Sequence, residues 1–442
     1  MRVRLDGRFT LACDPSGGTP VEPGDYVATG EGGAVAIRGA VDVHGSAPVL
    51  APSDLETDRL TVHDVTIGKD FHWQRRQSQD FQGALHIVAG ADGLTVVNEL
   101  PLEPYLASVI SSEMSASAPV GLLEAHAVVA RSWLLAQLRA TPPSDPILAK
   151  EAARGSSDGT GASVGETGRE IRRWYDRESH DAFDVCADDH CQRYQGVTRA
   201  FSKSVFDAVA STRGHALVHG GAVCDARYSK CCGGMTERFS TAWADVEVPY
   251  LQAVYDGTDP PSGLELPSVG PSAAEAWILS TPPAHCHRSD PDFLARVLPG
   301  FDQETRDFYR WEVVYAQDEL VELLARAGLD TGGVVGLDAL ERGPSGRIRR
   351  LRVRGRKGAW IVGKELEIRR TLSRSHLLSS AFVARFEGDE GGLPERVRLV
   401  GAGWGHGVGL CQIGAASMAD RGAGHREILA HYFRGAEIET LY

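Results

Sequence analysis

The sequence lacks the features that mark nucleic-acid-binding, membrane-spanning and disulfide-rich proteins. Its formal net charge is −13, from 46 Lys and Arg against 59 Asp and Glu, and no run of basic residues forms a patch for a polyanion. No apolar run approaches the ~20 residues that a membrane helix needs, and residues 1–6 do not open the apolar stretch of a secretory signal. We therefore expect no nucleic-acid partner and no integral membrane segment.

Cysteine is also scarce, with eight in 442 residues, far below the density of a small disulfide-stapled domain. Cys186 and Cys191 lie among histidines and aspartates, where a metal explains them better than a bridge. Cys231 and Cys232 are adjacent. Because neighbouring cysteines rarely bridge without strain, we expect thiols there, or one link elsewhere, for instance to Cys224.

Glycine, in contrast, is abundant, with 50 residues, many of them in short turns between β-branched runs. This pattern predicts a β-rich α+β fold. One long helix is expected from Pro119 to about Arg139. Leu122, Val129 and Trp133 recur there at helical spacing, and proline suits the first turn of a helix.

Shifts in pattern divide the chain into four parts. Residues 1–95 form a β-rich region, 96–260 the first part of a central core, 261–395 an inserted α+β lobe, and 396–442 a Gly-rich motif that completes the core. Within the core, the polar and aperiodic residues 141–170 predict a flexible loop. We expect the core to carry the chemistry and the β-rich lobes to flank it.

Glu113 is the candidate catalytic group. It lies between an apolar segment and the start of the long helix, where partial desolvation favours the protonated form of a carboxyl group and suits a general acid. Arg131, on the long helix, is expected to orient that carboxylate or a sugar oxygen. The alternative is that Glu113 only complements the dipole of the following helix.

The loop 180–191 is a candidate metal site. Two imidazoles and two thiolates lie close together in it, and this donor set is typical of tetrahedral zinc; the expected ligands are His180, Cys186, His190 and Cys191. Four protein ligands predict a structural or site-shaping ion, because a catalytic zinc keeps one position open. The alternative is a Cys186–Cys191 disulfide with solvated histidines. Should His180 not bind, the spare candidates are Asp184, Asp188 and Asp189.

Two further segments are candidates for binding substrate. The loop from Tyr228 to Glu237 offers glycines that allow close approach to a ligand and donors for acetamido and hydroxyl groups: Tyr228, Ser229, Lys230, Gly233, Gly234 and Thr236. The segment 403–415 alternates glycine with other residues and offers Trp404 for stacking on a sugar, with His406 and Gln412 as polar tips. The alternatives are an ordinary turn and a tight crossing of strands.

These segments resemble, in order, the motifs of the SpoIID/LytB family of stage II sporulation protein D and amidase enhancers. Ser112-Glu113-Met114 is followed by a helix with an Ala-x-x-Ala-Arg pattern ending at Arg131, then by Cys232-Gly233-Gly234-Met235-Thr236 and the box 403–415. Residues 369–372 and 379–382 resemble the stretch upstream of that box. The resemblance covers roughly residues 60–442, and four motifs in order are more specific than one.

The resemblance implies a peptidoglycan lytic transglycosylase. Such an enzyme cleaves the bond between N-acetylmuramic acid and N-acetylglucosamine and leaves 1,6-anhydro ends, with Glu113 as the single acid and base. Some relatives are similar in holding zinc at the place of the 180–191 loop. The implied partners are peptidoglycan glycan strands and an amidase or other cell-wall enzyme. The substrate implies the cell envelope, periplasm or exterior as the place of action, although no signal peptide is visible.

Two other functions fit the same motifs. The first is a non-catalytic glycan-binding amidase enhancer, although a mere binder has no need for a carboxylate tuned as an acid. The second is a zinc-dependent hydrolase in which the 180–191 loop activates water, a reading that four protein ligands disfavour.

Overall fold

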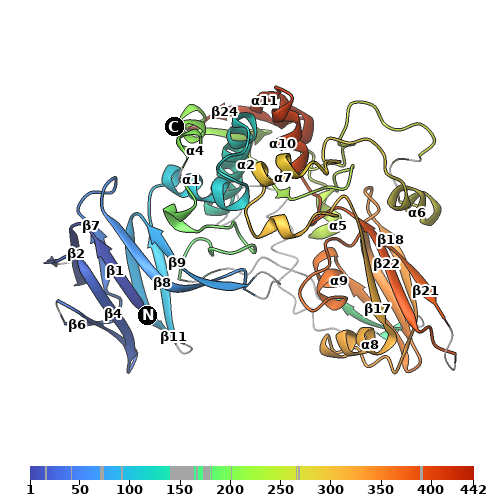
Figure 1. Cartoon of the computed structure of the whole chain (residues 1–442), viewed down its shortest axis with the longest axis horizontal. Helices are drawn as coiled ribbons and strands as arrows, with labels where there is room; N and C mark the ends of the chain where they lie inside the picture. Colours follow the sequence, from blue (N-terminus) through green and yellow to red (C-terminus); the bar gives the residue numbers. More distant parts are fainter. Residues whose placement is uncertain are drawn as a thin grey trace. The chain divides into compact units, whose positions relative to one another are not determined.

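The computed structural model describes the chain except for residues 15–16, 41, 70–73, 91–92, 140–163, 166–167, 173–179, 181, 201, 265, 267–268 and 389–391. The chain forms two compact units. The first joins Met1–Ser117 to His180–Arg213, and the second joins Ala118–Ser179 to Gly214–Tyr442. Their antiparallel sheets and interspersed helices confirm the predicted β-rich α+β fold (Figure 1). The predicted division into four parts stays a prediction.

Two antiparallel sheets make up most of the first unit. The six-stranded sheet has the order β6-β5-β4-β1-β8-β9, and the five-stranded sheet has the order β11-β10-β7-β2-β3. The strands are β1 (Arg2–Asp6), β2 (Phe9–Asp14), β3 (Gly17–Val21), β4 (Gly24–Glu31), β5 (Ala34–Arg38), β6 (Val43–Gly45), β7 (Val49–Pro52), β8 (Arg59–Ile67), β9 (Arg75–Phe81), β10 (Ala84–Gly90) and β11 (Gly93–Glu99). Alternate side chains such as Val3, Leu5 and Leu60 are buried, as expected when one face of each strand packs on a core.

Three short elements complete the first unit. Helix α1 (Leu102–Glu113) follows β11, and the returning segment contributes the 3-10 turn η1 (Gly196–Thr198) and helix α4 (Lys203–Ser211). Both of these pack against α1. The return therefore brings the loop that precedes η1 back to the end of α1.

The second unit begins with the long helix α2 (Val120–Arg139), which confirms the helix predicted from apolar spacing. It packs on β14 (His215–His219), α10 (Gln412–Asp420) and α11 (His425–Tyr432). Strand β14 pairs with β15 (Ala222–Val223) and with β24 (Glu437–Thr440). The C-terminal segment thus covers the helix that follows Glu113 in sequence.

The larger part of the second unit contains two further sheets, with the orders β17-β22-β21 and β12-β13-β20-β19-β18. Their elements are β12 (Val164–Gly165), β13 (Gly168–Arg172), β17 (Arg310–Ala316), α8 (Gln317–Arg326), β18 (Val334–Arg342), β19 (Ile348–Gly355), β20 (Gly358–Gly363), α9 (Glu365–Thr371), β21 (Phe382–Glu387) and β22 (Arg396–Ala402). They enclose one apolar core that includes Trp311, Leu320 and Leu351. Most of the predicted flexible loop 141–170 lies outside the described residues, and its end forms β12 and the start of β13.

Short elements connect these layers: β16 (Tyr228–Ser229), α5 (Phe239–Ala242), α6 (Pro271–Leu279), α7 (Pro291–Val297), η2 (Asp302–Glu304) and β23 (Leu410–Cys411). Strands β16 and β23 form a two-stranded parallel ladder. Among the described residues, no helix combines the length and apolar character needed to cross a membrane.

Candidate functional site

Glu113 is the last residue of α1, and α1 is buried along most of its length. Every side chain from Tyr105 to Glu113 is buried, and Glu113 itself is 7% exposed. The last turn of α1 contains no basic residue. A carboxylate at this end faces the negative pole of the helix dipole, so Glu113 does not complement a helix dipole in its own element.

The Cys/His-rich loop, residues 180–191, is followed closely by the residue that supports Glu113. The backbone N–H of Arg193 donates to Oε1 of Glu113 at 3.1 Å. The Arg193 guanidinium pairs with Asp189, with Nε 2.7 Å from Oδ1. Because Arg193 follows Cys191 by two residues, a displacement of Cys191 would move the group that holds the Glu113 carboxylate.

The same loop is tied to α1 at two more points. The hydroxyl of Tyr105 donates to Oε1 of Gln192 at 3.0 Å, and the backbone N–H of Gln195 donates to Oγ of Ser108 at 3.2 Å. Burial raises the pKa of the Tyr105 hydroxyl well above its usual value, and the negative charges of Cys191 and Glu113 raise it further. The loop and Glu113 thus share one buried environment.

The four predicted metal ligands lie together in this loop. The ligand atoms of His180, Cys186, His190 and Cys191 all lie within 4.8 Å of one another. Nε2 of His180 is 3.4 Å from Sγ of Cys191, and Nδ1 of His190 is 3.4 Å from that Sγ and 3.8 Å from Sγ of Cys186. The N–S edge of a tetrahedral zinc site measures about 3.6 Å, given Zn–S and Zn–N bonds of about 2.3 and 2.0–2.1 Å. The residues present therefore fit a metal of this kind.

The alternatives for this loop are weakened by its geometry. Cys186 and Cys191 are thiols in the structure. A hydrogen bond from Cys191, with others from His190 and the backbone, lowers the pKa of Cys186 to about 3, which favours the thiolate that a metal needs. Asp189 pairs with Arg193, and Asp188 accepts backbone N–H groups from Lys69 and Asp189, so these two spare carboxylates are already engaged.

In the second unit, the structure brings the two predicted substrate segments together. Tyr228 pairs with Leu410, and Ser229 pairs with Cys411, in the parallel ladder of β16 and β23. Cys231 and Trp404 form an antiparallel bridge, with N–O distances of 3.0 and 2.7 Å. Segments that lie far apart in the sequence thus form one continuous backbone arrangement.

Buried Arg347 organises this arrangement from β19. It lies just before that strand begins, and its guanidinium donates to the carbonyls of Cys232 and Gly405, both at 3.1 Å. A Cβ at Gly407, where φ is +77°, would lie 2.5 Å from Cζ of Arg347, so only glycine fits there. Gly403 and Gly407 therefore make room for this arginine.

Among the predicted substrate-binding side chains, Tyr228, Trp404 and His406 are half-buried. The His406 ring packs edge-on to Trp243 with centroids 4.7 Å apart, and its Nδ1 accepts the Val408 N–H at 3.0 Å. Burial, with the nearby charges of Arg227 and Arg347, holds the pKa of His406 well below its usual range. His406 is therefore neutral, with its proton on Nε2.

Other predicted contacts of this loop are made within the protein. Lys230 forms a buried ion pair with Asp302, with Nζ 2.9 Å from Oδ2. The Thr236 hydroxyl accepts the Val254 N–H at 2.7 Å. A Cβ on Gly233 would lie 2.9 Å from the Gly403 nitrogen, and one on Gly234 would lie 2.9 Å from the Tyr309 hydroxyl. These glycines admit neighbouring protein segments, and the sugar-binding role of this set stays a prediction.

Two predicted residues face α2. Gln412 is 1% exposed, and its Nε2 lies 3.4 Å from Nε2 of His126. Arg131 is fully buried, and its guanidinium donates to the His215 carbonyl at 3.0 Å, which ties α2 to β14. These contacts favour structural roles for both side chains, and a catalytic role for Arg131 stays a prediction.

Sequence reasoning missed His126, which is fully buried between Tyr228 and Gln412. Burial, and then the charge of Lys230, lowers the pKa of His126 to about 3. In the unfolded state, this histidine has a pKa of about 6.5 and binds a proton below that pH. The folded state does not bind this proton, so acid lowers the free energy of unfolding. The helical pattern alone marks His126 only as a core position.

We expect His126→Gln to reduce the sensitivity of the fold to acid. Between pH 6.5 and 5.0, the free energy of unfolding of the wild type should fall by about 2 kcal/mol because His126 stays neutral in the folded state. The variant lacks this histidine and should not show this fall. Denaturant unfolding at pH 7.5 and 5.0 measures this difference of differences. Equal pH dependence in the two proteins would show that His126 takes up its proton in the folded state.

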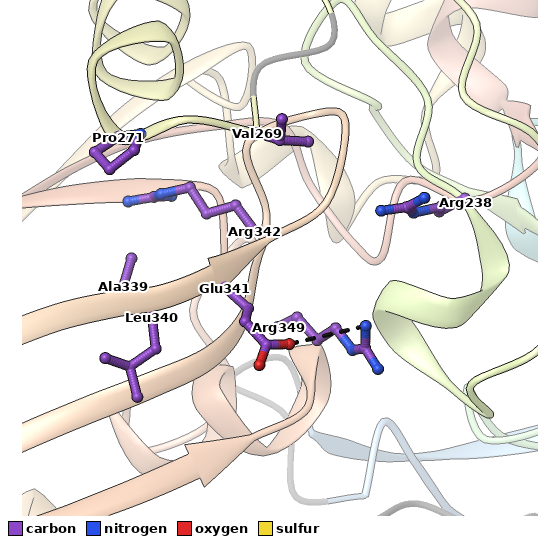
Figure 2. A pocket seen from close by; sticks show the side chains of 8 residues that line it. All are labelled: Arg238, Val269, Pro271, Ala339, Leu340, Glu341, Arg342 and Arg349. Carbon is purple, nitrogen blue, oxygen red and sulfur yellow. Dashed lines mark ion pairs between the residues drawn. The ribbon is translucent and has the colours of Figure 1, made fainter. Parts of the chain in front are cut away.

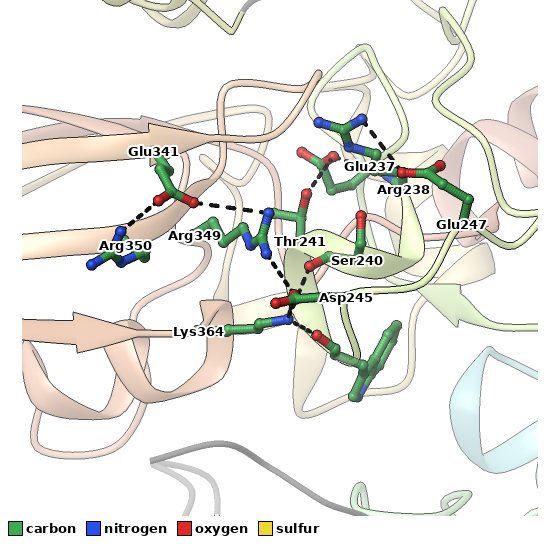
Figure 3. Close-up of polar contacts among 11 residues, drawn as sticks. Glu237, Arg238, Ser240, Thr241, Asp245, Glu247, Glu341, Arg349, Arg350 and Lys364 are labelled. Carbon is green, nitrogen blue, oxygen red and sulfur yellow. Dashed lines mark hydrogen bonds and ion pairs between the residues drawn. The ribbon is translucent and has the colours of Figure 1, made fainter. Parts of the chain in front are cut away.

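A second buried acid, Glu237, is the last residue of the Tyr228–Glu237 loop. Its carboxylate accepts from the hydroxyls of Thr241 at 3.0 Å and Ser345 at 2.6 Å. Beside it, Arg349 and Lys364 converge on Asp245 from β19 and the start of α9 (Figure 3). These contacts fasten the loop and α5 to the sheet.

A pocket of about 320 Å³ adjoins this network and shares Arg238, Glu341 and Arg349 with it (Figure 2). It is lined by Arg238, Val269, Pro271, Ala339, Leu340, Glu341, Arg342 and Arg349, none of which was predicted from the sequence. Arg349 pairs with Asp245 and Glu341, and Arg342 donates to the Phe382 carbonyl at 2.8 Å. Because protein groups already engage these arginines, the pocket is not our candidate site.

Comparison with known proteins finds two family matches. A family model described as stage II sporulation protein matches residues 90–219, which contain Glu113 and the Cys/His-rich loop. A domain of unknown function, DUF8618, matches residues 237–409. The first match thus covers the residues around the candidate acid.

Curated relatives agree with the first match. Stage II sporulation protein D of Bacillus amyloliquefaciens is 25% identical over 342 residues, 77% of this chain and 75% of that protein. The protein of the same name from Bacillus subtilis is 23% identical over 344 residues, with the same shares. The amidase enhancer of Bacillus subtilis is 24% identical over 240 residues, which cover 53% of this chain but 32% of that protein.

Proposed function

This chain belongs to the SpoIID/LytB family, and from that premise we propose that it is a lytic transglycosylase of cell-wall peptidoglycan. The observation that carries the proposal is the buried Glu113 carboxylate at the end of α1, supported by the Arg193 N–H beside a Cys/His cluster. Such an enzyme acts in the cell envelope or outside the cell. Its proposed substrate is the glycan strand.

The proposed reaction uses Glu113 twice. As a carboxylic acid it gives its proton to the glycosidic oxygen that leaves C1 of N-acetylmuramic acid, so that this C–O bond breaks. The oxygen of the 6-hydroxyl of the same sugar then attacks C1, and the Glu113 carboxylate takes the hydroxyl proton. A 1,6-anhydro end forms, the acid is regenerated, and no water is consumed.

The surroundings of Glu113 suit both of its proposed states. Burial and the negative end of α1 disfavour its charge and so favour the acid. The Arg193 N–H donates to Oε1, and it stabilises the carboxylate once the proton has left. A group balanced between these effects can serve first as acid and then as base.

We propose zinc in the Cys/His-rich loop, held by His180, Cys186, His190 and Cys191. When bound, the ion cross-links the loop and fixes the backbone that carries the Arg193 N–H. Four protein ligands leave no open position for a catalytic water, so the zinc-hydrolase function is disfavoured. A further cell-wall enzyme, such as an amidase, is a proposed partner, in view of the amidase-enhancer relative.

Mass spectrometry of the products from denuded and from peptide-bearing peptidoglycan tests the proposed reaction. We expect fragments with 1,6-anhydro-muramic ends. Reducing muramic ends, which carry one added water, would show a hydrolase and overturn the transglycosylase proposal. Absence of products from both substrates, together with stimulation of a cell-wall amidase, would establish the enhancer function.

Trp404 is expected to stack on a sugar ring of the strand. Trp404→Ala should weaken glycan binding about 2- to 12-fold, the equivalent of about 0.5–1.5 kcal/mol for an aromatic contact. Trp404→Phe keeps an apolar face and the backbone bridge to Cys231, so it should retain most of the affinity. Titration of both variants with soluble glycan fragments measures the difference, and equal affinity of Trp404→Ala and wild type would remove Trp404 from the binding surface.

A further inference from the structure

A second cluster of ligand atoms lies in the interior of the second unit. Sγ of Cys232, Cys286 and Cys411 and a carboxylate oxygen of Asp256 all lie within 4.8 Å of one another. Each of these residues is between 0 and 2% exposed. The vicinal thiol of Cys231 also contacts the Cys286 and Cys411 thiols. Three thiols and an acid have therefore been gathered where no solvent reaches them.

The four residues come from four separate segments of the chain. Cys232 follows β16, Asp256 lies in the loop before α6, Cys286 lies between α6 and α7, and Cys411 ends β23. An ion held by these four would cross-link the Tyr228–Glu237 loop, the Gly-rich box and the two intervening loops. The cluster is separate from the Cys/His-rich loop, which belongs to the first unit.

The spacing suits a tetrahedral ion. Sγ of Cys232 is 3.6 Å from Sγ of Cys286. Two thiolates on one zinc ion lie about 3.8 Å apart, given Zn–S bonds of about 2.3 Å. Three sulfur donors and one carboxylate oxygen, in a closed apolar interior, form a donor set that prefers zinc over magnesium or calcium.

Hydrogen bonds from neighbouring groups hold two of the four donors, Cys411 and Asp256. The backbone N–H of Cys232 donates to Sγ of Cys411 at 3.2 Å, and the N–H of Cys286 donates to Oδ2 of Asp256 at 2.9 Å. The Tyr432 hydroxyl donates to Oδ1 of Asp256 at 2.6 Å. Outer hydrogen bonds of this kind orient the ligands of metal sites and offset the negative charge of bound thiolates.

The charge of Asp256 favours a metal over disulfides. Oδ1 of this buried carboxylate lies 4.0 Å from Nε2 of His431, which carries a positive charge only when it is protonated. Joining the thiols in disulfides would leave this carboxyl group buried beside neutral sulfur atoms, with no cation to compensate its negative charge. A divalent cation supplies that compensation, and Cys232, Cys286, Cys411 and the neighbouring Cys231 are all thiols in the structure.

We propose that Cys232, Cys286, Cys411 and Asp256 bind a second, structural zinc ion that fastens the Gly-rich box to the neighbouring loops. On binding, each thiol gives its proton to solvent and the ion takes the vacated position, with no change of oxidation state. Four anionic ligands on Zn²⁺ leave a net charge of −2, the same as in a Cys₄ site.

Metal analysis of the full chain, purified without chelator, tests the proposal. We expect one equivalent of zinc to be lost when Cys286→Ser replaces the wild type, whatever the occupancy of the Cys/His-rich loop. Cys191→Ser should remove a different equivalent, and Cys224→Ser, a buried cysteine outside both clusters, should remove none. Zinc content unchanged by Cys286→Ser, or iron in place of zinc, overturns the proposal.

Thiol counting gives a second readout that does not depend on the folding of a variant. Wild-type protein, unfolded with chelator and without reductant, should present eight thiols. A lower count, with peptide mapping that places Cys232, Cys286 or Cys411 in a disulfide, would overturn the proposal. Replacement of zinc by Co²⁺ in folded wild type should add the absorption of tetrahedral thiolate-bound cobalt, at a level that falls in Asp256→Asn.

Discussion

Glu113→Gln is expected to lower the rate of glycan cleavage by about 10²–10⁴-fold, the contribution of a general acid–base group. Glutamine has nearly the same shape, and its amide oxygen can still accept the Arg193 N–H that reaches Oε1 in the wild type. It has no proton to give to a leaving oxygen. The rate of appearance of anhydro-muramic ends measures the loss, and circular dichroism verifies that the fold is retained.

Glu103→Gln is the matched control for this prediction. Glu103 lies in the first turn of the same helix, α1, at the opposite end from Glu113. This variant should cleave glycan at a rate close to that of the wild type. Full cleavage by Glu113→Gln would remove Glu113 from the mechanism and direct attention to the metal loop as the source of catalysis.

Much of the fold could be predicted from local sequence patterns. The helix α2 follows from apolar residues such as Leu122 and Val129 at helical spacing, and the strands of the first unit follow from alternation in short runs. The four ligand atoms of the Cys/His-rich loop also meet as predicted from their closeness in the sequence. In each case, the residues that decide the structure are near neighbours along the chain.

The partners of a polar side chain are harder to predict where distant segments meet. Thr236 and Gln412 are predicted to bind substrate because they carry polar groups, and that role stays a prediction. In the structure, the Thr236 hydroxyl accepts the Val254 N–H, and Gln412 lies against His126. A sequence states which groups can form hydrogen bonds and not which partners the fold supplies. The Cys286–Cys411 neighbourhood was invisible for the same reason, since its members share no local spacing.

Loss of metal from the Cys/His-rich loop is expected to have the second large effect. Structural zinc sites contribute about 10–16 kcal/mol in small zinc-dependent domains. The first unit has its own apolar core, so the metal should contribute less than this to its stability. A loss of about 4 kcal/mol would lower the melting temperature of the unit by roughly 8–16 °C. Cys191→Ser should show this fall in calorimetry, together with the loss of one equivalent of zinc.

Cleavage should fall with the metal, but by an indirect route. Cys191 is two residues from Arg193, whose N–H holds Oε1 of Glu113, so a loosened loop misplaces the acid. Asp184→Asn, a change at an exposed site in the same loop, should keep zinc, melting temperature and activity.

The kinetics of chelation separate the structural role of an ion from a catalytic one. If the zinc is structural, removing it should lower the cleavage activity at the same rate as the loop unfolds. If activity instead vanished at once on chelation and returned at once with zinc, at an unchanged melting temperature, the metal itself would carry out the chemistry.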